Sequence, residues 1–135
     1  MLPPAVRRIL SSARTVAVLG AHVQTSRPAF YVPDYLHSQG YTIIPVNAML
    51  AGQTLWGRTV LASLGEIDEP VDVVDVFRRS DALPGHLDEI IGMQEAPRVV
   101  WFQQGIRNDE VARALEARGI EVIQDRCMLA DHRAL

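Results

Sequence analysis

Residues 15–22 join an apolar, β-branched run to a glycine at Gly20, and a helix start follows at Pro28. Glycine lets the backbone turn sharply and approach an anion closely. The start of a helix offers unpaired N–H groups and a partial positive charge of about half an electron. The segment therefore predicts a phosphate-binding loop. Because the second and third glycines of the dinucleotide fingerprint are missing, it predicts nucleotide binding in a manner other than that of NAD.

The end of the second apolar run bears on the same question. NAD sites place an Asp or Glu there, about 20 residues beyond the glycines, to bind the ribose hydroxyls. This chain has Pro45, Val46 and Asn47 at that point, and no carboxylate follows before Glu66. The sequence therefore disfavours ordinary NAD binding.

Arginines follow four of the five predicted strands. In an open parallel sheet, ligands bind outside the carboxyl ends of the strands. Basic side chains at those ends would converge on one edge of an otherwise acidic protein, which predicts an anionic ligand larger than a single phosphate. The five side chains are Arg27, Arg78, Arg79, Arg107 and Arg126.

The elements that position these residues follow from the hydrophobic pattern. Five runs rich in Val and Ile, with little alternation, predict strands covered on both faces. They span residues 16–20, 42–46, 71–77, 99–103 and 121–124. Asp75 lies inside the third run, and we expect loop N–H groups to satisfy its carboxylate, because buried polar groups are normally hydrogen-bonded.

Helical patterns separate the strands. Leu83, Leu87 and Ile90 repeat with helical spacing, and a second pattern runs from an N-cap at Asn108 to a stop at Gly119. A further helix opens at Pro28 and ends at Gly40; Pro33 must lie in its first turn or kink it. Residues 3–13 predict a leading helix, and residues 48–70 a turn-rich excursion with one short helix near 62–65. Strand–helix alternation predicts a single α/β domain, residues 1–135, with a five-stranded parallel sheet and right-handed crossovers.

The composition and net charge of the chain limit the classes of partner, compartment and metal site that we expect. A net charge of -3 argues against non-specific nucleic-acid binding, which needs a cationic surplus. No apolar run reaches the roughly 20 residues that span a bilayer, and residues 1–13 do not resemble a signal peptide. The single Cys127 forms no internal disulfide and persists best as a thiol in a reducing compartment, so we expect a cytoplasmic protein. Histidines 37, 86 and 132 are too scattered for a zinc site.

The motifs occur in an order that resembles the small stand-alone CoA-binding proteins, whose domain is similar to the CoA-binding domain of succinyl-CoA synthetase. The segments that carry the resemblance cover nearly the whole chain, at residues 16–22, 40–47, 71–78, 101–106 and 125–127. The chain departs from the family pattern at Ala48, where a proline often follows the Pro-Val-Asn triplet.

The resemblance implies a three-layer, Rossmann-like fold with a site for coenzyme A or an acyl-CoA. Residues 20–22 would contact the pyrophosphate, residues 45–47 would border the adenosine, residues 77–78 would flank the nucleotide, and residues 104–105 would line the pantetheine path. An arginine would meet the 3′-phosphate, since its fork suits phosphate oxygens. The expected binding residues are Gly20, Ala21, His22, Ser26, Arg27, Pro45, Val46, Asn47, Phe77, Arg78, Arg79, Gln104, Gly105 and Ile106.

Two residues keep alternative interpretations. His22 would either donate to a phosphate oxygen or lie solvated in its loop. Cys127 has Asp131 and His132 close in sequence, which suits a nucleophile, but a lone cysteine is more often a small buried hydrophobe. A third hypothesis is a reversible mixed disulfide between Cys127 and the CoA thiol, with Arg126 favouring the thiolate.

We expect binding without catalysis. The phosphorylated histidine of the synthetase belongs to a later domain, and residues 1–135 supply no ATP-grasp partner for it. The alternatives are an NAD(P)-binding reductase-like protein, or an acyl-CoA-handling enzyme that uses Cys127. A CoA-sensing regulatory module with a protein partner, and a homodimer formed through apolar helix faces, are also open.

Overall fold

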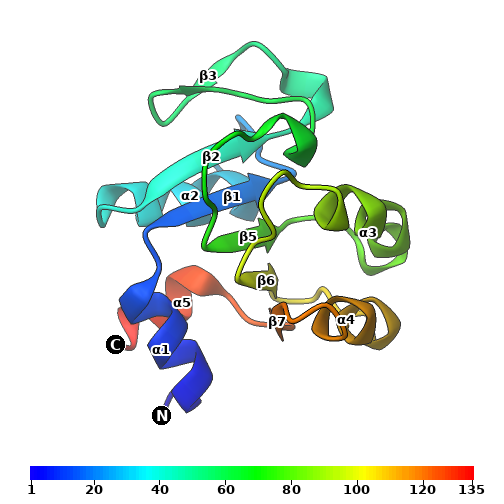
Figure 1. Cartoon of the computed structure of the whole chain (residues 1–135). Helices are drawn as coiled ribbons and strands as arrows, with labels where there is room; N and C mark the ends of the chain where they lie inside the picture. The colour runs from blue at the N-terminus through cyan, green and yellow to red at the C-terminus, as the bar shows by residue number, and fades with distance from the viewer.

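Five parallel strands form the central sheet in a computed structural model of residues Met1–Leu135 (Figure 1). The spatial order is β2-β1-β5-β6-β7, and every neighbouring pair is parallel. Each strand coincides with a predicted one, and the residues of the first four are almost all buried. The bounds are β1 Thr15–Leu19, β2 Thr42–Val46, β5 Val73–Val76, β6 Val99–Phe102 and β7 Glu121–Ile123.

Helices cover both faces of the sheet and make three layers, as predicted (Figure 1). One face packs a cluster of 17 buried residues against α3 (Leu83–Ile91) and α4 (Asp109–Glu116). The other packs 16 buried residues against α1 (Pro4–Ser12), α2 (Pro28–Ser38) and α5 (Met128–Arg133). The sequence did not predict α5, whose six residues are too few to display a helical period. None of these helices is both long enough and apolar enough to cross a membrane.

The excursion between β2 and β5 contains a small hairpin. Strands β3 (Thr54–Leu55) and β4 (Arg58–Thr59) pair antiparallel between the 3-10 helices η1 (Ala48–Leu50) and η2 (Leu64–Glu66). Trp56 occupies the turn at φ 52°. Its indole N–H donates to Asp34 Oδ1 at 3.1 Å, and its ring lies 5.7 Å from that of Phe30, so the hairpin is fastened to α2.

A single residue extends the sheet beyond β2. Leu61 forms an isolated parallel bridge with Val46, because its amide donates to Pro45 O and its carbonyl accepts from the Asn47 amide. With Leu61 counted as a rudimentary strand, the strand order becomes 3-2-1-4-5-6, the order of the doubly wound dinucleotide-binding fold. The fold is therefore Rossmann-like, with its third strand reduced to one bridge.

Gly20, directly after β1, allows the central strands to end close together. Its φ is +93°, and a Cβ added to it would lie 2.6 Å from Phe77 O. Real side chains do not tolerate that distance to a backbone atom. The neighbouring backbones are also joined directly, because Phe77 N–H donates to Leu19 O at 2.9 Å.

We predict that Gly20→Ala destabilises the protein more than Gly40→Ala. Both glycines have a positive φ, +93° and +97°, but nothing lies within 4 Å of a Cβ at Gly40. Both variants should lose about 1–2 kcal/mol through backbone strain, and Gly20→Ala a further 1–3 kcal/mol, roughly, because Phe77 must move. Urea denaturation measures the difference, and equal losses would show that close approach is not what Gly20 provides.

Candidate functional site

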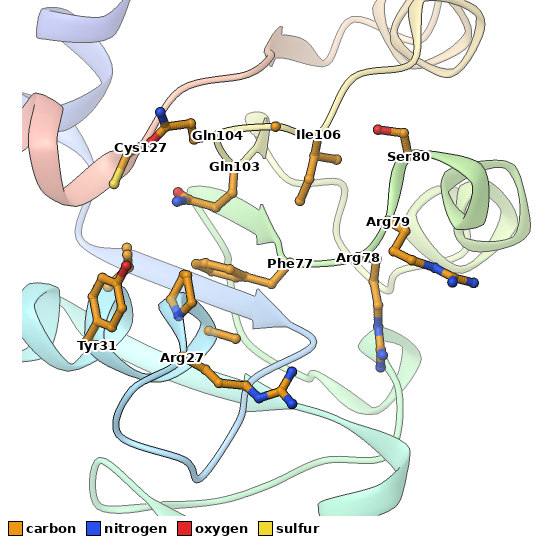
Figure 2. Close-up of a pocket in the computed structure, with 14 residues that line it drawn as sticks. Arg27, Tyr31, Phe77, Arg78, Arg79, Ser80, Gln103, Gln104, Ile106 and Cys127 are labelled. Carbon is orange, nitrogen blue, oxygen red and sulfur yellow. The ribbon is translucent and has the colours of Figure 1, made fainter.

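A cavity of about 530 Å³ opens at the carboxyl ends of β1, β5 and β6 (Figure 2). Its size falls in the range of small-molecule sites. Four segments meet there: the start of α2, the turn after β5, the turn after β6, and the residue before α5. The lining residues are Arg27, Pro28, Ala29, Tyr31, Val32, Phe77, Arg78, Arg79, Ser80, Gln103, Gln104, Gly105, Ile106 and Cys127.

The strand order explains this location. The chain leaves β1 through α2 and returns to β2 on one side, whereas β5 pairs with the other side of β1. The crossovers diverge at this point, so a crevice remains between them outside the strand ends. Open α/β sheets bind ligands at such switch points.

Pro33 inside α2 helps to fix the loop that leads from β1. As the sixth residue of the helix, it has no N–H to donate to the carbonyl of Ala29. That carbonyl accepts from the His22 N–H at 3.2 Å instead. The proline therefore does not end the helix. It leaves an acceptor that holds the β1–α2 loop against the first turn of α2.

The same loop is also held from the side of β2. The amides of Gly20 and Ala21 both donate to Val46 O, at 2.9 and 3.3 Å. The buried Asn47 side chain donates to Ala21 O at 2.8 Å and accepts from the Met49 amide at 2.9 Å. The Asn47 side chain therefore links the two loops by hydrogen bonds. Its amide group already has an acceptor for its N–H and a donor for its oxygen.

These contacts correct one expectation about the loop. The amides of residues 20–22 are all paired within the protein, so they are not the unpaired donors that the sequence pattern predicted. His22 Nδ1 is also engaged, since it accepts from the Gln24 amide at 3.0 Å. The amides that have no partner in the chain come later in the loop and at the helix start, at Val23, Thr25, Ser26 and Ala29.

Hydrogen bonds between turns hold the opposite wall of the cavity. Ser80 Oγ accepts from the Arg107 amide at 3.0 Å and joins the turn after β5 to the turn after β6. Asp125 Oδ1 accepts from the Gly105 amide at 2.6 Å, and the Asp125 amide donates to Ile106 O at 3.2 Å. Asp125 has a φ of 56°, a conformation that Asp adopts more readily than most residues.

Positive charge dominates the cavity although the protein is acidic overall. Its lining contains three arginines and no carboxylate. Arg27 and Arg78 form no salt bridge, and Arg79 lies 3.5 Å from Asp81 where both side chains are largely exposed. Figure 2 shows Arg78 and Arg79 on one side of the cavity, Arg27 along its lower edge between Tyr31 and Arg78, and Cys127 near Gln104 on the side opposite Arg78 and Arg79.

The two remaining arginines of the predicted set are neutralised elsewhere. Arg107 lies 3.2 Å from Asp109. Arg126 forms two hydrogen bonds with Asp131, at 2.7 and 3.0 Å. Neither of these two arginines lines the cavity, although both follow strands that end at this edge of the sheet. The pairing also means that Arg126 is not a free cation beside Cys127.

Half of the expected binding residues line the cavity: Arg27, Phe77, Arg78, Arg79, Gln104, Gly105 and Ile106. The others lie in the loop after β1, at the end of β2 and directly after it, outside the lining: Gly20, Ala21, His22, Ser26, Pro45, Val46 and Asn47. The expected set omitted the other seven lining residues, among them Tyr31 and Val32, which come from the helical turn after Pro28. Their spacing from Pro28 places all three on one face of α2. This spacing could have predicted from the sequence that Tyr31 and Val32 lie beside the site.

Asp75 lies in the middle of β5, opposite Val18 and Trp101 in the neighbouring strands. It is 0 % exposed, and neither carboxylate oxygen has a hydrogen-bond partner. The expectation that loop amides satisfy it is wrong, because the sheet places it one pleat below the loops. Burial raises the pKa of the Asp75 carboxyl well above its ordinary value of 3.8, so the folded protein favours the protonated form.

The strand order and the cavity define a Rossmann-like α/β domain with an anion-compatible crevice at its switch point. The chain belongs to the family described as CoA binding domain, which matches residues 14–133. It is 38% identical to the protein YneT of Bacillus subtilis (strain 168) over 127 residues, which cover 94% of this chain and 91% of that protein.

Two solved structures have the same fold. The cell-free ID.343 protein from Thermus thermophilus is 47% identical, with a TM-score of 0.93 over 99% of this chain and 98% of that one. A hypothetical protein from Pyrococcus horikoshii OT3 is 29% identical, with a TM-score of 0.89 over 100% of this chain and 92% of that one. The family membership supports a CoA-binding role.

One buried donor in the site, Arg78 Nε, lacks a hydrogen-bond acceptor that an anionic ligand could provide. Arg78 Nε is shielded from solvent and has no hydrogen-bond acceptor in the protein. It lies 3.3 Å from the point that a Cβ on Gly20 would occupy, so the guanidinium reaches the β1–α2 loop. A buried donor without an acceptor costs roughly 1–3 kcal/mol. A phosphate oxygen at this end of the cavity would provide an acceptor once the Arg78 side chain turned to expose Nε to the cavity that it lines.

Asp75 generates a prediction about pH. The unfolded chain loses the Asp75 proton above about pH 4, whereas the folded chain retains it, so stability falls as pH rises through the window between the two pKa values. The slope from this group alone approaches about 1.4 kcal/mol per pH unit. We expect Asp75→Asn to remove that contribution, so the stability of the variant relative to the wild type rises as the pH increases above about 4. Denaturation at several pH values measures the gap, and a constant gap contradicts the assignment.

Proposed function

We propose that the protein binds coenzyme A or an acyl-CoA in the cavity at the carboxyl ends of the sheet and does not transform it. The observation that carries the proposal is the lining itself: three arginines without a carboxylate, at the switch point of the sheet. Arginine binds phosphate through paired N–H groups, and CoA carries a diphosphate and a 3′-phosphate for several arginines to share.

The distribution of charge suggests an orientation for the ligand. The phosphates would lie at the end formed by Arg27, Arg78 and Arg79, where the free amides of Ser26 and Ala29 add donors at the start of α2. The adenosine would border residues 45–47, where Asn47 supports the loop. The uncharged pantetheine arm would run past Gln104 and Gly105 toward Cys127.

Binding without chemistry suits the cavity. Its lining includes no His, Asp or Glu that could act as a general acid or base, and Cys127 supplies its only thiol. In this proposal the protein is a carrier, a buffer or a CoA-sensing module in a reducing compartment such as the cytoplasm, where Cys127 stays a thiol. With the ligand so oriented, the sulfur of CoA would lie near Cys127. Under oxidising conditions, the Cys127 thiolate could exchange with CoA disulfide to form a reversible mixed disulfide and release one CoA thiol.

The first test compares ligands. We predict micromolar binding of CoA and acetyl-CoA, seen as a rise in melting temperature at millimolar ligand, with little change for NAD or NADP. A ligand stabilises a protein only in proportion to its affinity for the folded state. Mass spectrometry of the protein purified under native conditions should detect CoA or an acyl-CoA. A shift with NADP and none with CoA would favour the reductase-like alternative and overturn the proposal.

The arginines can be tested one by one. We predict that Arg27→Gln, Arg78→Gln and Arg79→Gln each weaken CoA binding, by about three- to tenfold, because a charge-assisted hydrogen bond to phosphate is lost. The variant at the arginine that meets the 3′-phosphate should bind CoA and dephospho-CoA equally, whereas the wild type prefers CoA. Calorimetry measures both affinities, which should also fall with added salt.

Arg113→Gln is the matched control for this series. Arg113 is exposed on α4, forms no salt bridge and lies outside the cavity, so its loss changes the net charge by the same amount without touching the site. If Arg113→Gln weakens CoA binding as much as the cavity variants do, the effect is a general one of net charge. If the wild type binds CoA and dephospho-CoA equally, no arginine recognises the 3′-phosphate.

A further inference from the structure

A second hollow adjoins the cavity at its uncharged end. It measures about 320 Å³ and shares Gln104 and Cys127 with the larger cavity. Its other walls come from the turn after β7 and from α5, and consist of Asp125, Arg126, Ala130 and Asp131. The two shared residues therefore lie between the arginine-lined cavity and a separate polar hollow.

We infer that this hollow is an acyl subsite, which takes a small uncharged acyl group carried on the thiol of CoA. The inference rests on the proposed function, because the direction of the ligand comes from the arginines at the far end of the cavity. A pantetheine arm that runs from those arginines past Gln104 ends at Cys127. Any group attached to its sulfur then continues into the space beyond Cys127, which is the hollow.

The charges of the hollow determine which acyl groups it accepts. The Arg126 guanidinium is held by both oxygens of Asp131, so this pair contributes no net charge. Asp125 forms no salt bridge, and its Oδ1 accepts only from a backbone amide, that of Gly105. One uncompensated negative charge therefore remains. It repels acyl groups that end in a carboxylate, and the polar walls offer a long apolar chain little surface to bury.

Butyryl-CoA and succinyl-CoA provide a matched pair for testing the charge, because their acyl groups both contain four carbons and differ in one carboxylate. At low ionic strength, butyryl-CoA should bind within about threefold of CoA, and succinyl-CoA about fivefold more weakly than butyryl-CoA. Asp125→Asn should close most of that gap. Asn keeps an acceptor for Gly105 and tolerates the backbone conformation. Asp88→Asn, an exposed position on α3, is the control for net charge and should leave the gap unchanged.

The volume of the hollow is tested separately. Ala130 lines the hollow but not the larger cavity, and it is exposed on α5. Ala130→Phe should fill the space, weakening butyryl-CoA by about fivefold or more while CoA binds as before. Calorimetry with both ligands gives the ratio of the CoA and butyryl-CoA affinities. A variant that simply fails to fold would lose both ligands and would not change this ratio.

The outcomes separate this inference from the proposed function. If the wild type does not bind CoA, both fail. If CoA binds but succinyl-CoA binds as tightly as butyryl-CoA, the charge assignment is wrong. If Ala130→Phe affects both ligands equally or neither, the acyl group does not enter this hollow, although CoA binding stands. A selective loss of butyryl-CoA, together with a closed gap in Asp125→Asn, supports the subsite.

Discussion

The close approach of two backbones at Gly20 determines where the other parts of the site lie. No Cβ fits between Gly20 and Phe77 O, and the strands on either side of β1 are joined to it at the same level. Val46 O receives two amides of the β1–α2 loop, and Leu19 O receives the amide of Phe77. The ends of three strands are thereby fixed together, and the start of α2 and the turn after β5 are brought to the two sides of one cavity.

The positive charge of the cavity depends on which arginines have carboxylate partners, and not on the overall composition of the chain. The chain has 16 acidic residues against 13 basic ones, yet the charged residues that line the cavity are all arginines. Arg107 and Arg126 are neutralised by carboxylates two and five residues later in the chain, whereas no carboxylate contacts Arg27 or Arg78. Arg79 also has a carboxylate neighbour, Asp81 at 3.5 Å, so Arg27 and Arg78 are the two arginines of the five without a carboxylate partner, and both line the cavity.

The centre of the sheet contains a polar group that stability alone would not select. Asp75 is buried in β5 among apolar neighbours without a hydrogen-bond partner. Burying an unpaired carboxyl is unfavourable, and the protein tolerates it because the group can keep its proton and because two clusters of apolar residues surround the sheet. Phe77, two residues further along on the same side of the strand, already belongs to the cavity.

The sequence by itself determined the fold class and the five strands, because fully buried parallel strands are continuous apolar runs bounded by glycine, proline and helix caps. It also placed Arg27, Phe77, Arg78 and the turn at 104–106 at one edge. Only the tertiary structure decided which donors are free. The amides of Gly20 and Ala21 donate to a carbonyl at the end of β2, which is distant in sequence. The His22 amide donates to a carbonyl of α2 that has no helical partner because Pro33 lacks an N–H. Hydrogen bonds and ion pairs of this kind depend on three-dimensional proximity, which local periodicity does not encode. For the same reason the sequence did not reveal the unpaired state of Asp75 or the hollow beside Cys127.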